Sequence, residues 1–186
     1  MIQTNNESRI KNIILTLSDK PTWDNRSSGT TSNLVGVTYG NNKFFTMLGT
    51  MSSSIGTVLT SSNGISWTSS SATCSSCGTD NVSLNDVTYR NSTFVAVGSS
   101  GKILTSSDGT SWDNRSSGTT SNLVGVTYGN NNFLTMTGSM DNGTNSTATV
   151  LASSNGTSWT SSSATCSTCD NNTVSINDVT YGNSTF

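Results

Sequence analysis

One short stretch occurs four times along the chain, once in each structural unit. Leu104 to Trp112 reads LTSSDGTSW, whereas Leu59 to Trp67 and Leu151 to Trp159 read LTSSNGISW and LASSNGTSW. Leu15 to Trp23 reads LTLSDKPTW, again with the leucine eight residues before the tryptophan. Successive tryptophans are 44, 45 and 47 residues apart. A period of this length predicts an array of similar units rather than two ordinary domains.

Each period contains clusters of β-branched and aromatic residues, separated by turns rich in Gly, Asn and Ser. The first full unit has strand candidates at 34–39, 44–49 and 57–61, and a fourth strand that starts at Trp67. In every unit a phenylalanine follows a tyrosine by five residues, which fixes the register of the first hairpin. Four antiparallel strands in about 45 residues is the size of one β-propeller blade.

The two ends of the chain together supply the parts of one further blade. The chain reaches the start of a second strand at Phe186, and its beginning supplies a third strand near Leu15 and a fourth at Trp23. We therefore expect an all-β, four-bladed β-propeller of four-stranded antiparallel blades, closed by N- and C-terminal strands that share one blade. The expected blades of this single domain (1–186) are 24–67, 68–112, 113–159, and 160–186 completed by 1–23.

Pairing of the termini between two chains is the alternative, and it forms an eight-bladed ring. Both a monomer and a homodimer therefore stay open.

The units alternate in kind. The sequence WDNRSSGTTSNLVGVTYGNN begins at both Trp23 and Trp112, whereas WTSSSATCSxC begins at both Trp67 and Trp159. These identical stretches are 89 and 92 residues apart. A tandem duplication of a two-blade pair is the simplest account.

Charge and hydropathy exclude some partners. The net charge is −2, with only 10% charged residues and no basic cluster, so we expect no nucleic-acid binding. The apolar run at Ile13-Ile14-Leu15 is too short to insert into a membrane or to form a signal-peptide core. Low charge, abundant Ser, Thr and Asn, and paired cysteines indicate a secreted or cell-surface protein.

Three stretches carry a resemblance to a known family. The turn at 106–112, the strand at 85–89 (NDVTY) and the strand at 94–98 (FVAVG) resemble bacterial propeller repeats of the Asp-box type. They look closest to repeats grouped with the photosystem II stability and assembly factor, and are also similar to the Asp-box repeats of sialidases. The resemblance covers almost the whole chain and implies the fold but no particular activity. One departure is that Asp108 and Gly109 are adjacent, whereas an Asp box has one residue between them.

The four tryptophans share one strand position, which favours a structural role. Trp23, Trp67, Trp112 and Trp159 are expected to pack as core between blades, with sugar stacking as the alternative. Asp108 and its equivalents Asn63 and Asn155 are expected to form turns rather than to bind a ligand.

Two CxxC pairs lie in matching loops, at Cys74 and Cys77 and at Cys166 and Cys169. Local disulfides that staple these loops are the favoured interpretation, with free thiols, a zinc site and a redox site as alternatives. A zinc site would have to join pairs that are 92 residues apart. We expect no metal.

Asp86 and Asp178 occupy the innermost strand at the position held by Gly36 and Gly125 in the alternate units. Across a central channel the two carboxylates would suit a cation. The favoured interpretation is that each carboxylate caps a backbone amide in a neighbouring blade.

Catalysis has few candidate residues, because the chain has no His and its one Glu is Glu7. We expect no enzyme and no cofactor, but a noncatalytic secreted or surface-displayed module with a structural or adhesive role toward another surface protein. The alternative is a carbohydrate-binding propeller whose glycan sites are duplicated loops. These loops are Asn25, Arg26, Ser27 and Ser28, with their copies Asn114, Arg115, Ser116 and Ser117.

Overall fold

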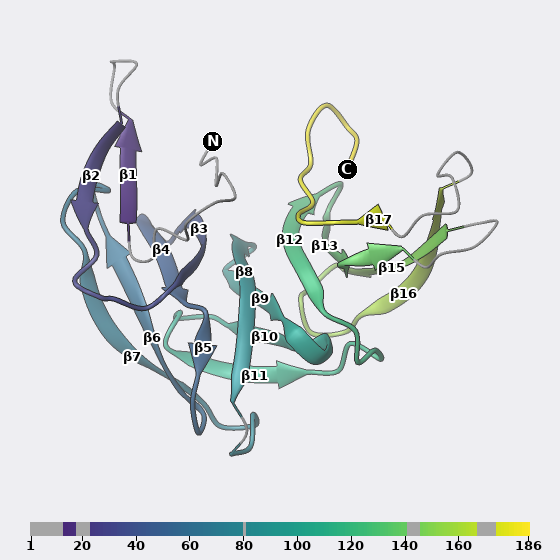
Figure 1. Cartoon of the computed structure of the whole chain (residues 1–186), viewed down its shortest axis with the longest axis horizontal. Coiled ribbons are helices and arrows are strands. Elements are labelled where there is room, and N and C mark those ends of the chain that lie inside the picture. Colours follow the sequence, from purple (N-terminus) through teal and green to yellow (C-terminus); the bar gives the residue numbers. More distant parts are fainter. Residues whose placement is uncertain (1–12, 18–22, 80, 141–145, 167–173) are drawn as a thin grey trace.

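The computed structural model describes residues 13–17, 23–79, 81–140, 146–166 and 174–186. These residues form β-strands and one 3-10 turn, η1 (Ser99–Gly101), so the all-β prediction is confirmed (Figure 1). The described part of the chain contains no α-helix, and hence none that would cross a membrane.

Three consecutive units of four antiparallel strands make up most of the molecule. The first unit consists of β3 (Leu34–Gly40), β4 (Lys43–Leu48), β6 (Ile55–Ser61) and β7 (Thr68–Cys74). The second consists of β8 (Val82–Arg90), β9 (Thr93–Gly98), β10 (Ile103–Ser106) and β11 (Ser111–Arg115). The third consists of β12 (Leu123–Gly129), β13 (Asn132–Thr137), β15 (Ser146–Ser153) and β16 (Thr160–Cys166). The remaining strands are β1 (Ile13–Leu17), β2 (Trp23–Ser27), β5 (Thr50–Met51), β14 (Ser139–Met140) and β17 (Val174–Ser175).

The first hairpin of each unit is set by its turn residues. In the first unit Asn41 and Asn42 have φ of 51° and 60°, the left-handed pair that a two-residue hairpin turn requires. The corresponding pairs are Asn91-Ser92, Asn130-Asn131 and Asn183-Ser184. The resulting register pairs Tyr39 with Phe44, Tyr89 with Phe94 and Tyr128 with Phe133. These rings pack at centroid distances of 5.0, 4.5 and 4.9 Å.

In the recurring SS(D/N)G turns, the Asp or Asn side chain accepts hydrogen bonds from backbone amides of the same turn. Asp108 Oδ1 accepts hydrogen bonds from the amides of Thr110 and Ser111 at 2.6 and 2.7 Å. Asn63 and Asn155 make the same two bonds in the first and third units. The indole Nε1 of Trp67, Trp112 and Trp159 donates to the carbonyl of the turn glycine in each case, at 2.8–3.1 Å. The repeated stretch is therefore a turn closed by its tryptophan.

The innermost strands β3, β8 and β12 lie side by side, and the outer strands of each unit fan away from them (Figure 1). A short parallel pairing of β11 with β7 joins the first and second units into one nine-stranded sheet. The third unit is a separate four-stranded sheet.

Two apolar clusters fill the spaces between the units. The cluster between the first and second units includes Phe45, Met47, Phe94 and Trp112. The cluster between the second and third units includes Ile103, Leu123 and Phe133. Each blade-like sheet is thus held by its neighbours, because a single sheet of this size cannot bury its own apolar face.

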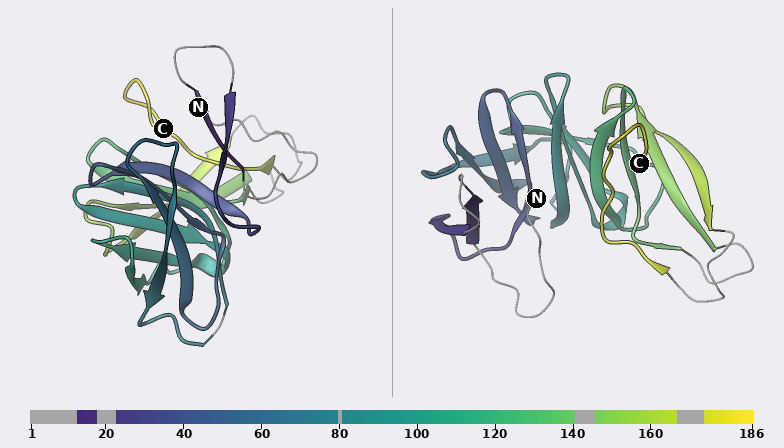
Figure 2. Two further views of the ribbon diagram at one scale, coloured as in Figure 1. Left: turned by 90° about the vertical axis from the view of Figure 1, so that its left-hand side faces the viewer. Right: turned by 90° about the horizontal axis from the view of Figure 1, so that it is seen from above.

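The blade expected from the two ends is not assembled. Strands β1 and β2 form a separate two-stranded sheet, while β17 pairs with β14 near the other end. Figure 1 and the right-hand view of Figure 2 show these two ends on opposite sides of an opening. The described array is curled and open.

Candidate functional site

Two copies of an Asp–Arg pair are held in the same way on the outer strands β2 and β11. Arg115 Nη2 lies 3.0 Å from Asp113 Oδ2, and Arg115 Nε donates to Thr105 Oγ1 at 2.8 Å. In the other copy, Arg26 Nη2 lies 2.9 Å from Asp24 Oδ2, and Nε donates to Thr16 Oγ1 at 3.0 Å. The threonine comes from the neighbouring strand in both cases, so strand pairing fixes the direction of each guanidinium.

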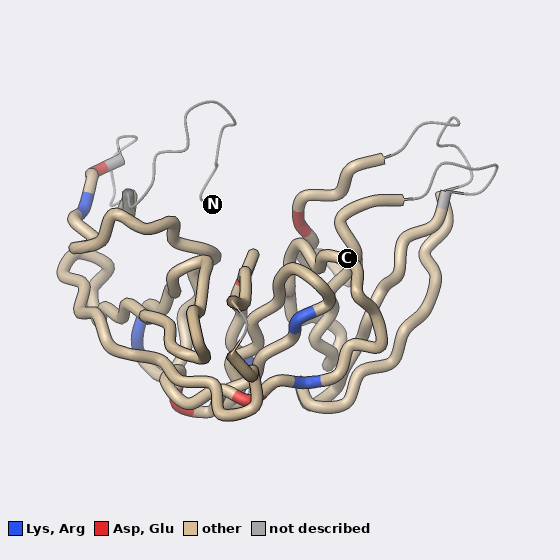
Figure 3. The backbone as a smooth tube through the Cα atoms, turned by 60° about the horizontal axis from the view of Figure 1, so that its bottom comes forward, with Lys and Arg blue, Asp and Glu red and all other residues tan. Residues whose placement is uncertain are grey.

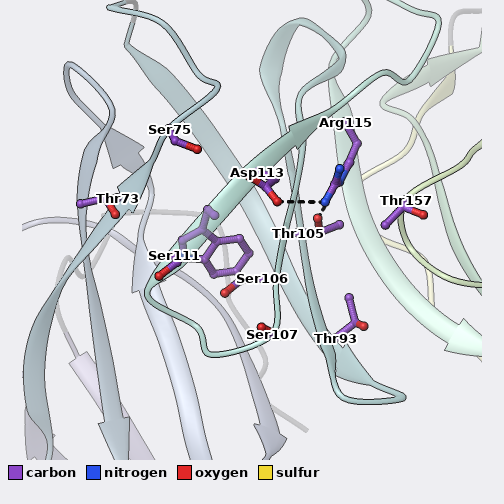
Figure 4. Close-up of a pocket in the computed structure, with 11 residues that line it drawn as sticks. Thr73, Ser75, Thr93, Thr105, Ser106, Ser107, Ser111, Asp113, Arg115 and Thr157 are labelled. Carbon is purple, nitrogen blue, oxygen red and sulfur yellow. Dashed lines mark hydrogen bonds and ion pairs between the residues drawn. The ribbon is translucent and has the colours of Figure 1, made fainter.

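The Arg115 pair lies in an open hollow of about 360 Å³ that is rich in hydroxyl groups (Figure 4). Its lining residues besides Trp112, Asp113 and Arg115 are Thr73, Ser75, Thr93, Thr105, Ser106, Ser107, Ser111 and Thr157. A second hollow, of about 550 Å³, is lined by residues 25–31 beside the other pair.

Only some of the eight residues of the predicted loops line a hollow. Asn25, Arg26, Ser27 and Ser28 line the second hollow, whereas Arg115 alone of its four residues lines the first. Ser117 is buried and donates to the carbonyl of Thr119, and the amide of Asn114 donates to Ser76 Oγ. These bonds give Ser117 and Asn114 structural roles. The predicted loops did not include Asp24 and Asp113, although both are part of the same repeated WDNRSS stretch.

Each pair offers both hydrogen-bond donors and acceptors at a surface with little other charge. Nη1 of both arginines has no partner among the described residues. Each side chain of the pairs is partly exposed, between 28% and 56%. Figure 3 shows Lys, Arg, Asp and Glu scattered along the backbone rather than gathered on one face. The pairs are therefore nearly neutral sites that suit a polar, uncharged ligand.

Asp86 caps a neighbouring unit rather than facing an open channel. Its Oδ1 accepts from the amide of Val87 at 2.8 Å, and its Oδ2 accepts from the amide of Val126 in the third unit at 2.9 Å. Asp178 accepts from the amide of Val179 at 2.7 Å. The described residues contain no group of three or more His, Cys, Asp or Glu side chains that would hold a metal.

Glycine in the alternate unit makes room for this carboxylate. A Cβ on Gly36 would lie 2.3 Å from Asp86 Oδ1, and a Cβ on Gly125 would lie 2.1 Å from Asp178 Oδ1. The Gly/Asp alternation that the sequence shows therefore reflects close packing between the innermost strands of neighbouring units. Asn85 adds a second bond across the next boundary, from Nδ2 to the carbonyl of Leu123.

Burial raises the pKa of Asp86 from 3.8 to about 6. The hydrogen bonds from the amides of Val126 and Val87 act in the opposite direction and lower this pKa, whereas the nearby Asp178 carboxylate raises it further. Because the folded-state pKa lies above the unfolded value, this stabilising contribution is present below about pH 4 and is lost as the pH rises through 6. We expect the free energy of unfolding to fall by at most about 3 kcal/mol between about pH 4 and pH 7.

Denaturant unfolding followed by circular dichroism at each pH measures this fall. Asp86→Asn is the control variant and should show no such fall. Rising stability of the wild-type chain over the same interval would contradict the assignment.

The cysteines and tryptophans have the following places. Cys74 and Cys77 form a disulfide that closes the loop between β7 and β8, and Cys166 is also disulfide-bonded. Cys169 lies outside the described residues. Trp112 is buried in the first cluster, whereas Trp67 and Trp159 are half-buried. The side chain of Trp23 is not among those described.

No protein-family model and no curated protein sequence matches the chain. The fold is similar to that of a GH32 beta-fructofuranosidase from Bombyx mori, a mutant solved in complex with sucrose. The match covers 70% of this chain and 34% of that chain, at 12% sequence identity and a TM-score of 0.47. The chain thus spans about a third of that enzyme's length, and the neighbour has a propeller-like fold.

This comparison contradicts the expectation that the chain is not an enzyme, because the similar structure is that of an enzyme. The expectation rested on the absence of His and the single Glu, and residue types alone do not exclude chemistry by Asp side chains. We therefore withdraw the description of the chain as noncatalytic. The likeness itself is too distant to assign an activity.

Proposed function

We propose that the chain is a secreted or surface-displayed adhesive module whose ligands are carbohydrates. The observation that supports this most is the duplicated Asp–Arg pair, in which a threonine from the neighbouring strand orients each arginine and each arginine lines a hollow. Neighbouring sugar hydroxyls both donate and accept hydrogen bonds. They match a carboxylate and a guanidinium fork lying side by side.

The surroundings of the pairs support the same ligand class. Eight Ser and Thr residues line the Arg115 hollow, which suits a ligand bound through many weak polar contacts. Two copies of the pair on one chain gain affinity when a ligand carries repeated sugar units that reach both. The disulfide of Cys74 with Cys77 supports an extracellular location, and the scattered charge supports a glycan or another surface protein rather than nucleic acid as partner.

The proposal includes the finer architecture. We infer Asp-box-type propeller repeats whose end strands share one blade, either within one chain as a four-bladed ring or between two chains as an eight-bladed ring. The SS(D/N)G turns support the repeat type. Among the described residues, each end forms only a two-stranded sheet, β1 with β2 and β17 with β14, so each end lacks strands that the other carries.

Binding to a glycan array tests the ligand class. The wild-type chain should bind a subset of neutral glycans, and the double variant Arg26→Ala with Arg115→Ala should bind them at least about tenfold more weakly. Lys43→Ala is the matched control, because it removes one exposed positive charge away from both hollows and should leave binding unchanged. No binding of the wild-type chain to any glycan at high protein concentration would reject the carbohydrate proposal.

A structural or protein-adhesive role is the second candidate. It is favoured by the fact that each arginine already has an aspartate partner within the chain, so that neither hollow displays an unpaired charge. A negative glycan array would favour this role.

A further inference from the structure

Two copies of one seven-residue strand differ in what covers them. Strands β3 and β12 both read LVGVTYG. In β12, Leu123 is fully buried and Val126 is 4% exposed, because β8 of the preceding unit packs on them. In β3, Val37, which corresponds to Val126, is 40% exposed, and Tyr39 is 57% exposed whereas its copy Tyr128 is half-buried. The sequence of the strand is therefore suited to a cover that β3 lacks.

The residues that cover β12 have a second copy near the end of the chain. Three side chains make hydrogen bonds across the β8–β12 boundary. Asn85 donates to the carbonyl of Leu123, and Asn91 donates to the hydroxyl of Tyr128. Asp86 accepts from the amide of Val126. The copies of these three residues are Asn177, Asp178 and Asn183. All three copies are exposed.

The C-terminal segment, residues 174–186, already sits as an innermost strand on the third unit. The amide of Ile176 donates to the carbonyl of Gly138, as the amide of Leu84 does to Gly49 in the first pair of units. Tyr181 packs against Gly129, and Asp178 against Gly125. One side of the segment is thus docked, and the side that carries Asn177 and Asn183 faces outward.

The exposed apolar residues gather on the parts that would meet. Leu15, Val37, Tyr39 and Phe186 belong to the hairpin β1–β2, to β3 and to the C-terminal segment. The residues equivalent to Leu15 and Phe186 in the second unit, Leu104 and Phe94, are 0% and 3% exposed. Ile55 and Ile65 are the other large exposed apolar residues in the described part of the chain, and neither lies on these parts.

We propose that the C-terminal segment of a second copy of the chain covers the β3 face, defined as Leu34, Val37 and Tyr39, and that two copies close a ring through two identical contacts. Asp178 of one copy then accepts from the amide of Val37 of the other, as Asp86 accepts from Val126. The shared blade combines the C-terminal segment of one copy with β1–β2 of the other.

A second copy fits better than the chain's own segment for a geometric reason. Strand β3 and the C-terminal segment lie on opposite sides of the opening in Figure 1, and the segment is held in place on the third unit. Closure within one chain requires the units to change their relative packing. In the proposed dimer a two-fold axis relates two identical contacts, and neither contact needs any described strand pairing to break.

Light scattering after size-exclusion chromatography tests this proposal. The wild-type chain should have about twice the mass of 19.4 kDa, and Tyr39→Glu should have the mass of one chain at the same concentration. Ile65→Glu is the matched control, because Ile65 is 51% exposed and lies outside the face, and it should remain a dimer. Asp178→Ala, on the opposite face, should weaken the dimer at least about tenfold and guards against misfolding of the Tyr39 variant.

A wild-type chain of single mass would overturn the proposal, as would a Tyr39→Glu variant that dimerises as tightly as the wild type. If the dimer is absent, hydrogen exchange at the Val37 amide shows whether anything else covers the β3 face. Protection in a monomer would show closure by the chain's own segment, and rapid exchange would show an uncovered face; either result rejects the second copy. Glycan binding is measured on different residues, so its failure leaves this test unaffected.

Discussion

Replacing Trp112 by alanine should lower the free energy of unfolding by about 3–5 kcal/mol. Trp112 is 1% exposed and lies between the first and second units, with its ring 6.2 Å from Phe45 and 6.3 Å from Phe94. Its Nε1 also donates to the carbonyl of Gly109 at 3.0 Å. The substitution removes a large buried side chain, leaves a cavity between two sheets and frees a turn carbonyl.

The repeat supplies the control for this variant. Trp67 makes the same bond to its turn glycine, at 3.1 Å, but its ring is only half-buried. Trp67→Ala should therefore cost clearly less than Trp112→Ala in guanidinium unfolding followed by far-ultraviolet circular dichroism. Equal losses would show that the turn bond, rather than burial between the units, accounts for the effect.

Gly101→Ala should destabilise the chain by about 3–5 kcal/mol, since two independent costs combine at this position. Gly101 has a φ of +68°, which an L side chain rarely adopts. A Cβ there would also lie 1.9 Å from the carbonyl oxygen of Thr119 and 2.8 Å from Ser117 Oγ. The carbonyl belongs to the backbone, so no rotamer change relieves the clash.

Gly118→Ala separates the two costs. Gly118 has a similar φ of +73°, but a Cβ there meets no atom within 4 Å. This substitution should lower the free energy of unfolding only by the cost of a side chain at positive φ, about 1–2 kcal/mol. Thermal and denaturant unfolding of the two variants side by side gives the comparison, and equal losses would exclude the clash as the main cost at Gly101.

The order of strands within each unit was predictable because local signals set it. Asn-Asn and Asn-Ser turns specify two-residue hairpins, and the constant spacing from tyrosine to phenylalanine fixes their register, as at Tyr89 and Phe94. The relative placement of the units had no such signal. Closure depends on how much each boundary rotates one sheet against the next, and this rotation follows from contacts such as Asp86 with Val126 that are 40 residues apart.

The candidate site was predictable only in part. The repeated NRSS letters pointed to Arg26 and Arg115. Strand alternation puts Asp113 on the same side of β11 as Arg115, whereas Ser117 lies beyond the end of β11, where it is buried and bonds Thr119. The threonines that orient the arginines come from the preceding strand. Their role in orienting the arginines depends on the register of β10 against β11, in which Thr105 lies opposite Asp113.

The nine-stranded sheet holds both members of one pair of units. The backbone ladder runs unbroken through the first two units and stops before β12, the first strand of the third unit, although the repeated letters already begin at Trp112 in β11. Each copy also repeats the short link between its members, as β5 with β8 and as β14 with β17. The pair is therefore the unit that keeps these contacts, because each aspartate-bearing strand fits against a glycine-bearing one. Inserting a pair inside the array preserves this alternation, whereas inserting a single blade there would set like strands against each other.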